Sequence, residues 1–292
     1  MTKFRSLSAF TIAATLSFIA NIPQACASKI KIVAAENFYG DIANQIGGNL
    51  VDVSSILSNP DQDPHLFEAS PSVARSIAQA QIVVLNGLDY DPWAEHLLAA
   101  SAAPGLSIIS AGIVAGKTTG DNPHIWYDLD TMRKVAKTIA EKLVEIDPAN
   151  APIYRKNEID FEQSLLPIIQ QISTLNRDHK GLAVAATEPV FGYMFQSMGF
   201  EVKELNFQIA IMNDTEPSIS DMAQFENDLN THAIKILAYN AQATSPLADR
   251  MMALAAKQTI PIIAVSETEP AGKTYQQWMA DNVNAVAHAI GG

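Results

Sequence analysis

Strand-like and helix-like segments alternate along almost the whole chain, and this alternation constrains the fold more than any other feature. Short apolar, β-rich runs occur at residues 29–35, 51–57, 81–87 and 105–111, and segments with helical spacing of apolar residues lie between them. Such an alternation is typical of a parallel sheet covered by helices. We therefore expect an α/β fold.

The second half of the chain begins again in the same way. The stretch VAAENFYGDIANQIG, from Val33, resembles VAATEPVFGYMFQSMG, from Val184, with one residue inserted in the second copy. Further strands are expected at residues 182–187, 201–207, 234–240 and 260–266. The sequence therefore predicts two similar lobes, each a parallel sheet covered by helices.

A long helical segment separates these two halves. Apolar residues recur at helical spacing between residues 129 and 180, and no glycine interrupts them before Gly181. Pro148 is placed to start the second helix of this region, and Pro167 lies within it at a position where a kink is expected. We expect one long interlobe helix that acts as a stiff connection rather than a flexible hinge.

The N-terminus has the pattern of a secretory signal. Lys3 and Arg5 precede an apolar stretch, and Ala25–Ala27 offers a small-residue cleavage site. The expected organisation is a signal peptide at 1–27, an N-terminal metal-binding lobe at 28–147, the interlobe helix at 148–180 and a C-terminal metal-binding lobe at 181–292. We predict a periplasmic protein. Lipid anchoring at Cys26 is disfavoured, because the preceding residues lack the leucine usual at such sites.

Composition excludes several classes of partner and site. The chain is 48% hydrophobic with a formal charge of −12, which suits a globular protein and disfavours nucleic acid as a partner. Cys26 is the only cysteine, so cleavage leaves neither a disulfide nor a thiolate ligand. We expect a monomer whose acidic surface attracts cations.

Two of the six histidines stand in an unusual local setting. His65 and His124 each follow a proline at the end of an expected βα loop, where parallel-sheet proteins place their ligands. Proline fixes its own φ and restricts the residue before it, so both imidazoles lie on a constrained backbone. The other four histidines are expected on helix faces or at the surface.

Carboxylates occupy comparable places in the other lobe. Glu188 and Glu267 each follow an expected strand, and Glu269 and Glu36 are rivals for the same role. An acid at such a place can also cap the next helix. All these groups converge if the carboxyl ends of the two sheets face each other.

Four segments give the chain a family resemblance. DPHLFEASPSVARSIAQAQIVVLNGLDYDPW, NPHIWYDL, DPANAPIYRKN and SETEPAGKTYQQWM resemble the motifs of the TroA-like and ZnuA-like metal-binding proteins of bacterial zinc and manganese ABC importers (cluster 9, type A-I). The resemblance covers essentially the mature chain. It implies two α/β lobes rigidly joined by one helix, with one divalent metal ion buried between them and delivered to a membrane permease.

The resemblance also implies the ligands, which are His65, His124, Glu188 and Glu267. The family's fourth ligand is usually aspartate, and the local segment is shorter here, so Glu269 stays an alternative to Glu267. Asp128 is expected either to orient an imidazole or to cap a helix. Trp126 and Phe67 are expected to shield the site.

Metal identity is open between Mn²⁺ and Zn²⁺, with Fe²⁺ as a further candidate. Imidazole suits zinc and iron, whereas carboxylate oxygens suit manganese as well. The third ligand of the resembled family is Glu188 here, and no histidine-rich loop precedes Asp121. By resemblance to that family, both features favour manganese. Two alternative functions are a metal-dependent hydrolase and a metal-stabilised surface or adhesion protein. We expect that the protein is not an enzyme, since four protein ligands would fill the coordination sphere of zinc and no HExxH motif occurs.

Overall fold

The computed structural model describes the chain except for residues 1–27, 60–63, 65–66, 102–103, 244 and 292. The described residues form two four-stranded, wholly parallel sheets with the orders β2-β1-β3-β4 and β6-β5-β7-β8. The strands are β1 (Ile30–Glu36), β2 (Val51–Leu57), β3 (Ile82–Leu85), β4 (Ser107–Ser110), β5 (Ala183–Ala186), β6 (Glu201–Val202), β7 (Leu237–Asn240) and β8 (Ile262–Val265). The same order in both sheets confirms the predicted pair of similar α/β lobes.

Helices cover both faces of each sheet. They are α1 (Asn37–Gly47), α2 (Pro71–Gln79), α3 (Pro92–Ala100), α4 (Ala111–Val114), α5 (Leu129–Ile146), α6 (Ala151–His179), α7 (Gly192–Ser197), α8 (Leu205–Met212), α9 (Ile219–Asn230), α10 (Pro246–Lys257) and α11 (Tyr275–Gly291). Alternate residues of a strand enter opposite cores, because side chains alternate across a strand. Ile32 packs with α1 and α5, whereas Val33 packs with α2 and α3.

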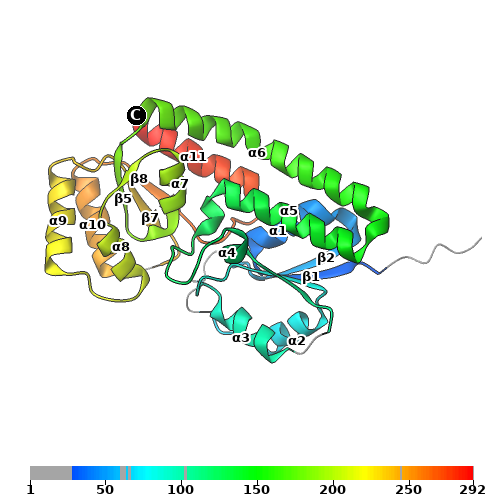
Figure 1. Cartoon of the computed structure of the whole chain (residues 1–292). Coiled ribbons are helices and arrows are strands. Elements are labelled where there is room, and N and C mark those ends of the chain that lie inside the picture. The colour runs from blue at the N-terminus through cyan, green and yellow to red at the C-terminus, as the bar shows by residue number, and fades with distance from the viewer. Residues whose placement is uncertain (1–27, 60–63, 65–66, 102–103, 244, 292) are drawn as a thin grey trace, which may run out of the picture.

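Helix α6 runs along both lobes, and α11 returns beside it (Figure 1). One hydrophobic core continues from the first lobe into the second through aromatic side chains. The Phe38 ring lies 5.9 Å from that of Trp278, and the Tyr127 ring lies 4.9 Å from that of Phe191. Because interiors pack at nearly crystalline density, this shared core holds the lobes as one unit.

Two local predictions need correction. The expected strand at 201–207 is only two residues long, since Glu204 adopts a left-handed conformation and α8 begins at Leu205. Pro148 opens a short 3-10 turn, Pro148–Asn150, rather than the long helix itself. Helix α6 begins at Ala151 and continues through Pro167 without a break.

Candidate metal centre

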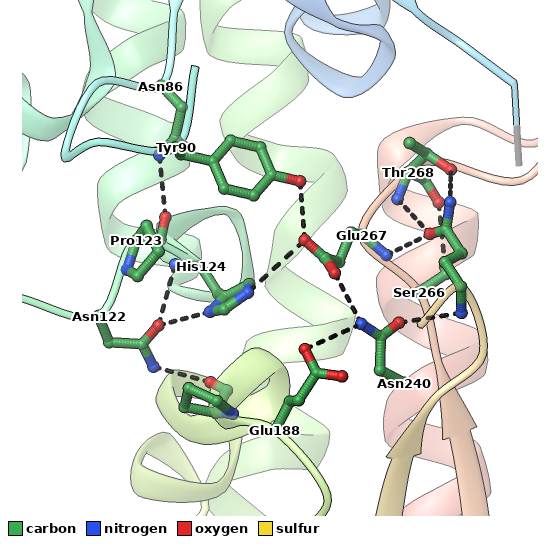
Figure 2. A network of polar contacts seen from close by, with 12 residues as sticks. Asn86, Tyr90, Asn122, Pro123, His124, Glu188, Asn240, Ser266, Glu267 and Thr268 are labelled. Carbon is green, nitrogen blue, oxygen red and sulfur yellow. Dashed lines mark hydrogen bonds and ion pairs between the residues drawn. The ribbon is translucent and has the colours of Figure 1, made fainter. Parts of the chain in front are cut away.

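Three polar residues of the site lie at the carboxyl ends of strands in the second sheet. Asn240 is the last residue of β7, Glu188 follows β5 by two residues, and Glu267 follows β8 by two residues. His124 comes from the other lobe, in the loop before α5. These side chains point toward one another across the space between the lobes (Figure 2).

His124 is fully buried, and Asn122 fixes its orientation. The Asn122 amide nitrogen donates to the carbonyl oxygen of Pro189 at 2.7 Å, so Asn122 Oδ1 must be the atom that faces the imidazole. His124 Nδ1 lies 2.6 Å from that oxygen and therefore carries the proton, and the His124 backbone N–H donates to the same oxygen at 3.1 Å. Nε2 is left as the basic nitrogen, which is the tautomer that a metal ligand needs.

Glu267 is also fully buried and meets the histidine across the lobes. Its Oε2 lies 3.7 Å from His124 Nε2 and accepts a hydrogen bond of 2.9 Å from Tyr90 Oη. The Glu267 backbone N–H donates to Gln242 Oε1 at 2.6 Å, which fixes the loop after β8. A cation placed beside His124 Nε2 and Glu267 Oε2 would be attracted to both atoms.

Asn240 links the two carboxylates of the second lobe. Its side-chain amide donates to Glu267 Oε1 at 2.6 Å and to Glu188 Oε2 at 3.3 Å. Glu188 itself is only 5% exposed and precedes the 3-10 turn Pro189–Phe191. Glu188 and Glu267 are thus joined through Asn240 in one buried polar network, and Glu267 lies beside His124 in the same network.

Neutral donors orient these carboxylates. Burial, followed by the charges of Glu267 and Glu36, raises the pKa of Tyr90 well above its usual value. Tyr90 is therefore a neutral hydroxyl donor at physiological pH. It orients Glu267 without neutralising the carboxylate, and Asn240 does the same because an amide carries no charge.

The rival carboxylates Glu36 and Glu269 have other immediate neighbours. Glu36 ends β1 and is fully buried, and burial and then the charge of Asp91 raise its pKa well above the usual range. Burial and then Asp41 raise the pKa of Glu269 to about 9. The Glu269 backbone N–H also donates to Asn37 Oδ1 at 2.9 Å, next to α1.

Asp128 caps a helix. Its carboxylate accepts from the backbone N–H of Asp130 at 3.2 Å and from Thr131 Oγ1 at 2.6 Å, at the start of α5. The structure thus shows the capping alternative for Asp128, and Asn122 is the residue beside His124 Nδ1. Among shielding residues, Trp126 is buried with its ring 5.1 Å from that of His124, whereas Phe67 packs on Trp93 at 4.9 Å.

The remaining predicted ligand, His65, lies outside the described residues, and its neighbour Pro64 is buried. Within the described part of the chain, no three His, Cys, Asp or Glu side chains form a cluster able to hold a metal ion. The described helices also include none that is long and apolar enough to cross a bilayer.

Sequence reasoning missed Asn122, Asn240, Tyr90 and Gln242 as site residues. Neutral amides and a tyrosine give no charge or spacing signal of their own. Their positions did offer one, because Asn122 directly precedes the Pro-His pair and Asn240 closes a strand that points at the site.

Fold and site together define a two-lobed binding protein with a buried polar centre between its lobes. Residues 32–289 match the family described as ZnuA, the zinc-uptake complex component A, periplasmic, and the chain belongs to this family.

Individual relatives are distant but cover much of the chain. The manganese-binding lipoprotein MntA of Bacillus subtilis is 23% identical over 283 residues, which is 90% of each chain. The iron-binding protein YfeA of Yersinia pestis is 26% identical and covers 68% of each chain.

Solved structures share the fold. The periplasmic zinc-binding protein TroA of Treponema pallidum superposes with a TM-score of 0.73 at 16% identity, covering 90% of this chain and 99% of its own. FpvC of Pseudomonas aeruginosa, in complex with Mn²⁺, gives a TM-score of 0.74 at 22% identity, with the same coverage.

Proposed function

We propose that this protein captures one divalent transition-metal ion outside the cytoplasmic membrane and delivers it to the permease of an ABC importer. The observation that carries the proposal is the approach of His124 Nε2 to Glu267 Oε2, 3.7 Å apart and fully buried, from opposite lobes. Within a family of metal-uptake components, a nitrogen and an oxygen donor brought together from two lobes support binding of a cation between them.

The proposed ligands are His65, His124, Glu188 and Glu267. Two neutral imidazoles and two carboxylates would balance the charge of a divalent ion. His65 enters this set from its sequence motif, and the other three are favoured by the geometry around Asn240 and Asn122. Glu269 is the less favoured alternative to Glu267, because its carboxyl lies near Asp41 and its backbone N–H donates to Asn37 Oδ1 beside α1.

The functional organisation follows from these ligands. We propose that residues 28–147 and 181–292 act as the two metal-binding lobes, with residues 148–180 as the stiff connection. Relatives named for manganese and iron, and a structural neighbour described as zinc-binding, support a cargo among Mn²⁺, Zn²⁺ and Fe²⁺.

The export signal at residues 1–27 remains part of this proposal. The name of MntA describes a lipoprotein, so anchoring through Cys26 is the alternative to release by cleavage. The mass of the mature N-terminus, measured on protein from the native host, distinguishes a free Ser28 terminus from a lipid-modified cysteine.

The test of metal capture is thermal unfolding with and without metal. A ligand that binds only the folded state at one hundred times its Kd stabilises that state by about 2.7 kcal/mol. We expect Mn²⁺ or Zn²⁺ to raise Tm and a chelator to reverse the rise. An unchanged Tm under both treatments contradicts the proposal.

A hydrolase is the competing function. It needs an open metal position for water together with a general base. Metal-loaded protein should show no turnover of ester or peptide substrates, whereas turnover that is lost in a Glu188→Gln variant would favour the enzyme. Failure of a deletion strain to grow in chelated medium, restored by added metal, supports uptake over a purely structural or adhesive role.

A further inference from the structure

Asn240 is held in a single orientation beside the candidate ligands. Its Oδ1 accepts from the Gln242 backbone N–H at 3.0 Å, so the amide nitrogen must face the opposite way. Its own backbone N–H donates to Thr187 Oγ1 at 3.2 Å, next to Glu188. Asn240 is only 4% exposed, so water does not compete strongly for the N–H donors of its side-chain amide.

The amide occupies one oxygen of each carboxylate. Nδ2 donates to Glu267 Oε1 at 2.6 Å and to Glu188 Oε2 at 3.3 Å, as Figure 2 shows. Glu267 Oε2 is then the oxygen that lies near His124 Nε2, at 3.7 Å. A cation beside His124 therefore meets Glu267 through Oε2, which Asn240 does not contact and which keeps a lone pair beside its hydrogen bond from Tyr90 Oη.

Such an arrangement restricts how a carboxylate binds a metal ion. Two-oxygen binding requires the carboxylate to rotate so that both oxygens face the ion, whereas a short hydrogen bond from a fixed amide to one oxygen opposes that rotation. Zinc commonly takes four ligands in a tetrahedron, while manganese favours six-coordinate, oxygen-rich sites that two-oxygen carboxylates help to complete. Restricting each carboxylate to one oxygen lowers the coordination number that the site offers.

We propose that Asn240 is a specificity-determining positioning residue, which keeps Glu188 and Glu267 in single-oxygen ligation and so favours Zn²⁺ over Mn²⁺. This inference rests on the proposed function, since it assumes that both carboxylates contact the cargo. The restriction by Asn240 opposes the preference for manganese that Glu188 would otherwise confer.

The experiment uses Asn240→Ala in the full mature chain. Competition titration with Zn²⁺ and Mn²⁺ should show the Zn²⁺:Mn²⁺ affinity ratio falling by about tenfold, or about 1.4 kcal/mol. Co²⁺ bound to the wild type should absorb visible light strongly, as four-coordinate Co²⁺ does, and the variant should show the weaker absorption of a higher coordination number. Should Asn240→Ala fail to fold, Asn240→Leu keeps a similar side-chain volume while removing the donor and adding no charge.

Thr268→Val is the matched control. Thr268 Oγ1 accepts from Gln242 Nε2 at 3.0 Å in the same network, and the substitution leaves the amide of Asn240 in place. The affinity ratio and the Co²⁺ spectrum of this variant should match the wild type.

The outcomes separate this inference from the function on which it rests. A wild type that binds neither metal contradicts the proposed function. A wild type that binds metal, with an unchanged ratio and Co²⁺ spectrum in the Asn240 variant, overturns the role of Asn240. An equal loss of both affinities, or the same shift in Thr268→Val, shows only structural support and overturns it as well.

Discussion

Replacing Asn122 by alanine should weaken metal binding without any change to a ligand. Asn122 Oδ1 accepts from His124 Nδ1 at 2.6 Å and from the His124 backbone N–H at 3.1 Å, and its amide donates to the Pro189 carbonyl at 2.7 Å. The residue therefore orients an imidazole of one lobe and holds the backbone beside Glu188 of the other. Loss of a hydrogen-bond partner of a ligating histidine typically costs 10- to 100-fold in affinity, which is about 1.4 to 2.7 kcal/mol.

The metal-free protein should also lose stability in Asn122→Ala. Three hydrogen bonds of about 0.5–1.5 kcal/mol each disappear, so the free energy of unfolding should fall by about 2–4 kcal/mol. Chemical denaturation gives this free energy, and competition against a chelator of known affinity gives the metal Kd.

Asn122→Asp separates the two roles. The aspartate keeps an acceptor for His124 Nδ1 but has no donor for the Pro189 carbonyl. Its metal affinity should stay within about threefold of the wild type, or rise, while the unfolding free energy of the metal-free protein falls by about 1–3 kcal/mol. Wild-type affinity in Asn122→Ala would refute the reasoning, and so would an equal loss of affinity in both variants.

Three further predictions concern the site and its surroundings. Metal affinity measured from pH 7.5 to 5 should fall with proton uptake, because ligating imidazoles must be neutral and free histidine titrates near pH ~6.5; a flat profile argues against histidine ligands. Glu188→His should raise the Zn²⁺:Mn²⁺ affinity ratio by at least about tenfold in competition titrations, and Glu188→Gln controls for the loss of charge. The pKa of Glu269, raised to about 9 by burial and then Asp41, lies above the ordinary value of 4.5, so the folded state retains a proton that the unfolded state releases between these pH values. The unfolding free energy of the metal-free protein should therefore fall through this group as pH rises from 4.5 to 9, and Glu269→Gln should stabilise it at pH 8 by about 1–3 kcal/mol; equal denaturation curves for both proteins at pH 8 contradict this assignment.

The fold follows closely from the sequence because its signals are long and repeated. Strands β1 and β5 lie at the same place in their sheets, as the two Val-Ala-Ala segments predict, and α6 matches the glycine-free helical stretch. The prediction is wrong at residues 201–207, where two strand residues precede a helix that is apolar on most sides. Apolar runs this short do not distinguish a strand from a buried helix.

The candidate site follows from the sequence only in part. The acids after β5 and β8 lie at the carboxyl ends of parallel strands, where ligands commonly bind, and the proline before His124 marks the loop that reaches them from the other lobe. The same local pattern occurs at Glu36 and Glu269, and only tertiary packing reveals that their carboxyls lie near Asp91 and Asp41. The contacts of Asn122 with Pro189 and of Asn240 with Glu188 join segments more than fifty residues apart, which no local pattern encodes.

The most direct test of metal capture between the lobes is a crystal structure of the metal-loaded protein, with anomalous diffraction recorded at the absorption edge of the bound ion. A single anomalous peak should lie beside His124 Nε2 and Glu267 Oε2, within bonding distance of residues from both lobes. A peak bound by residues of one lobe alone, or no peak in protein that retains metal through gel filtration, would contradict the account.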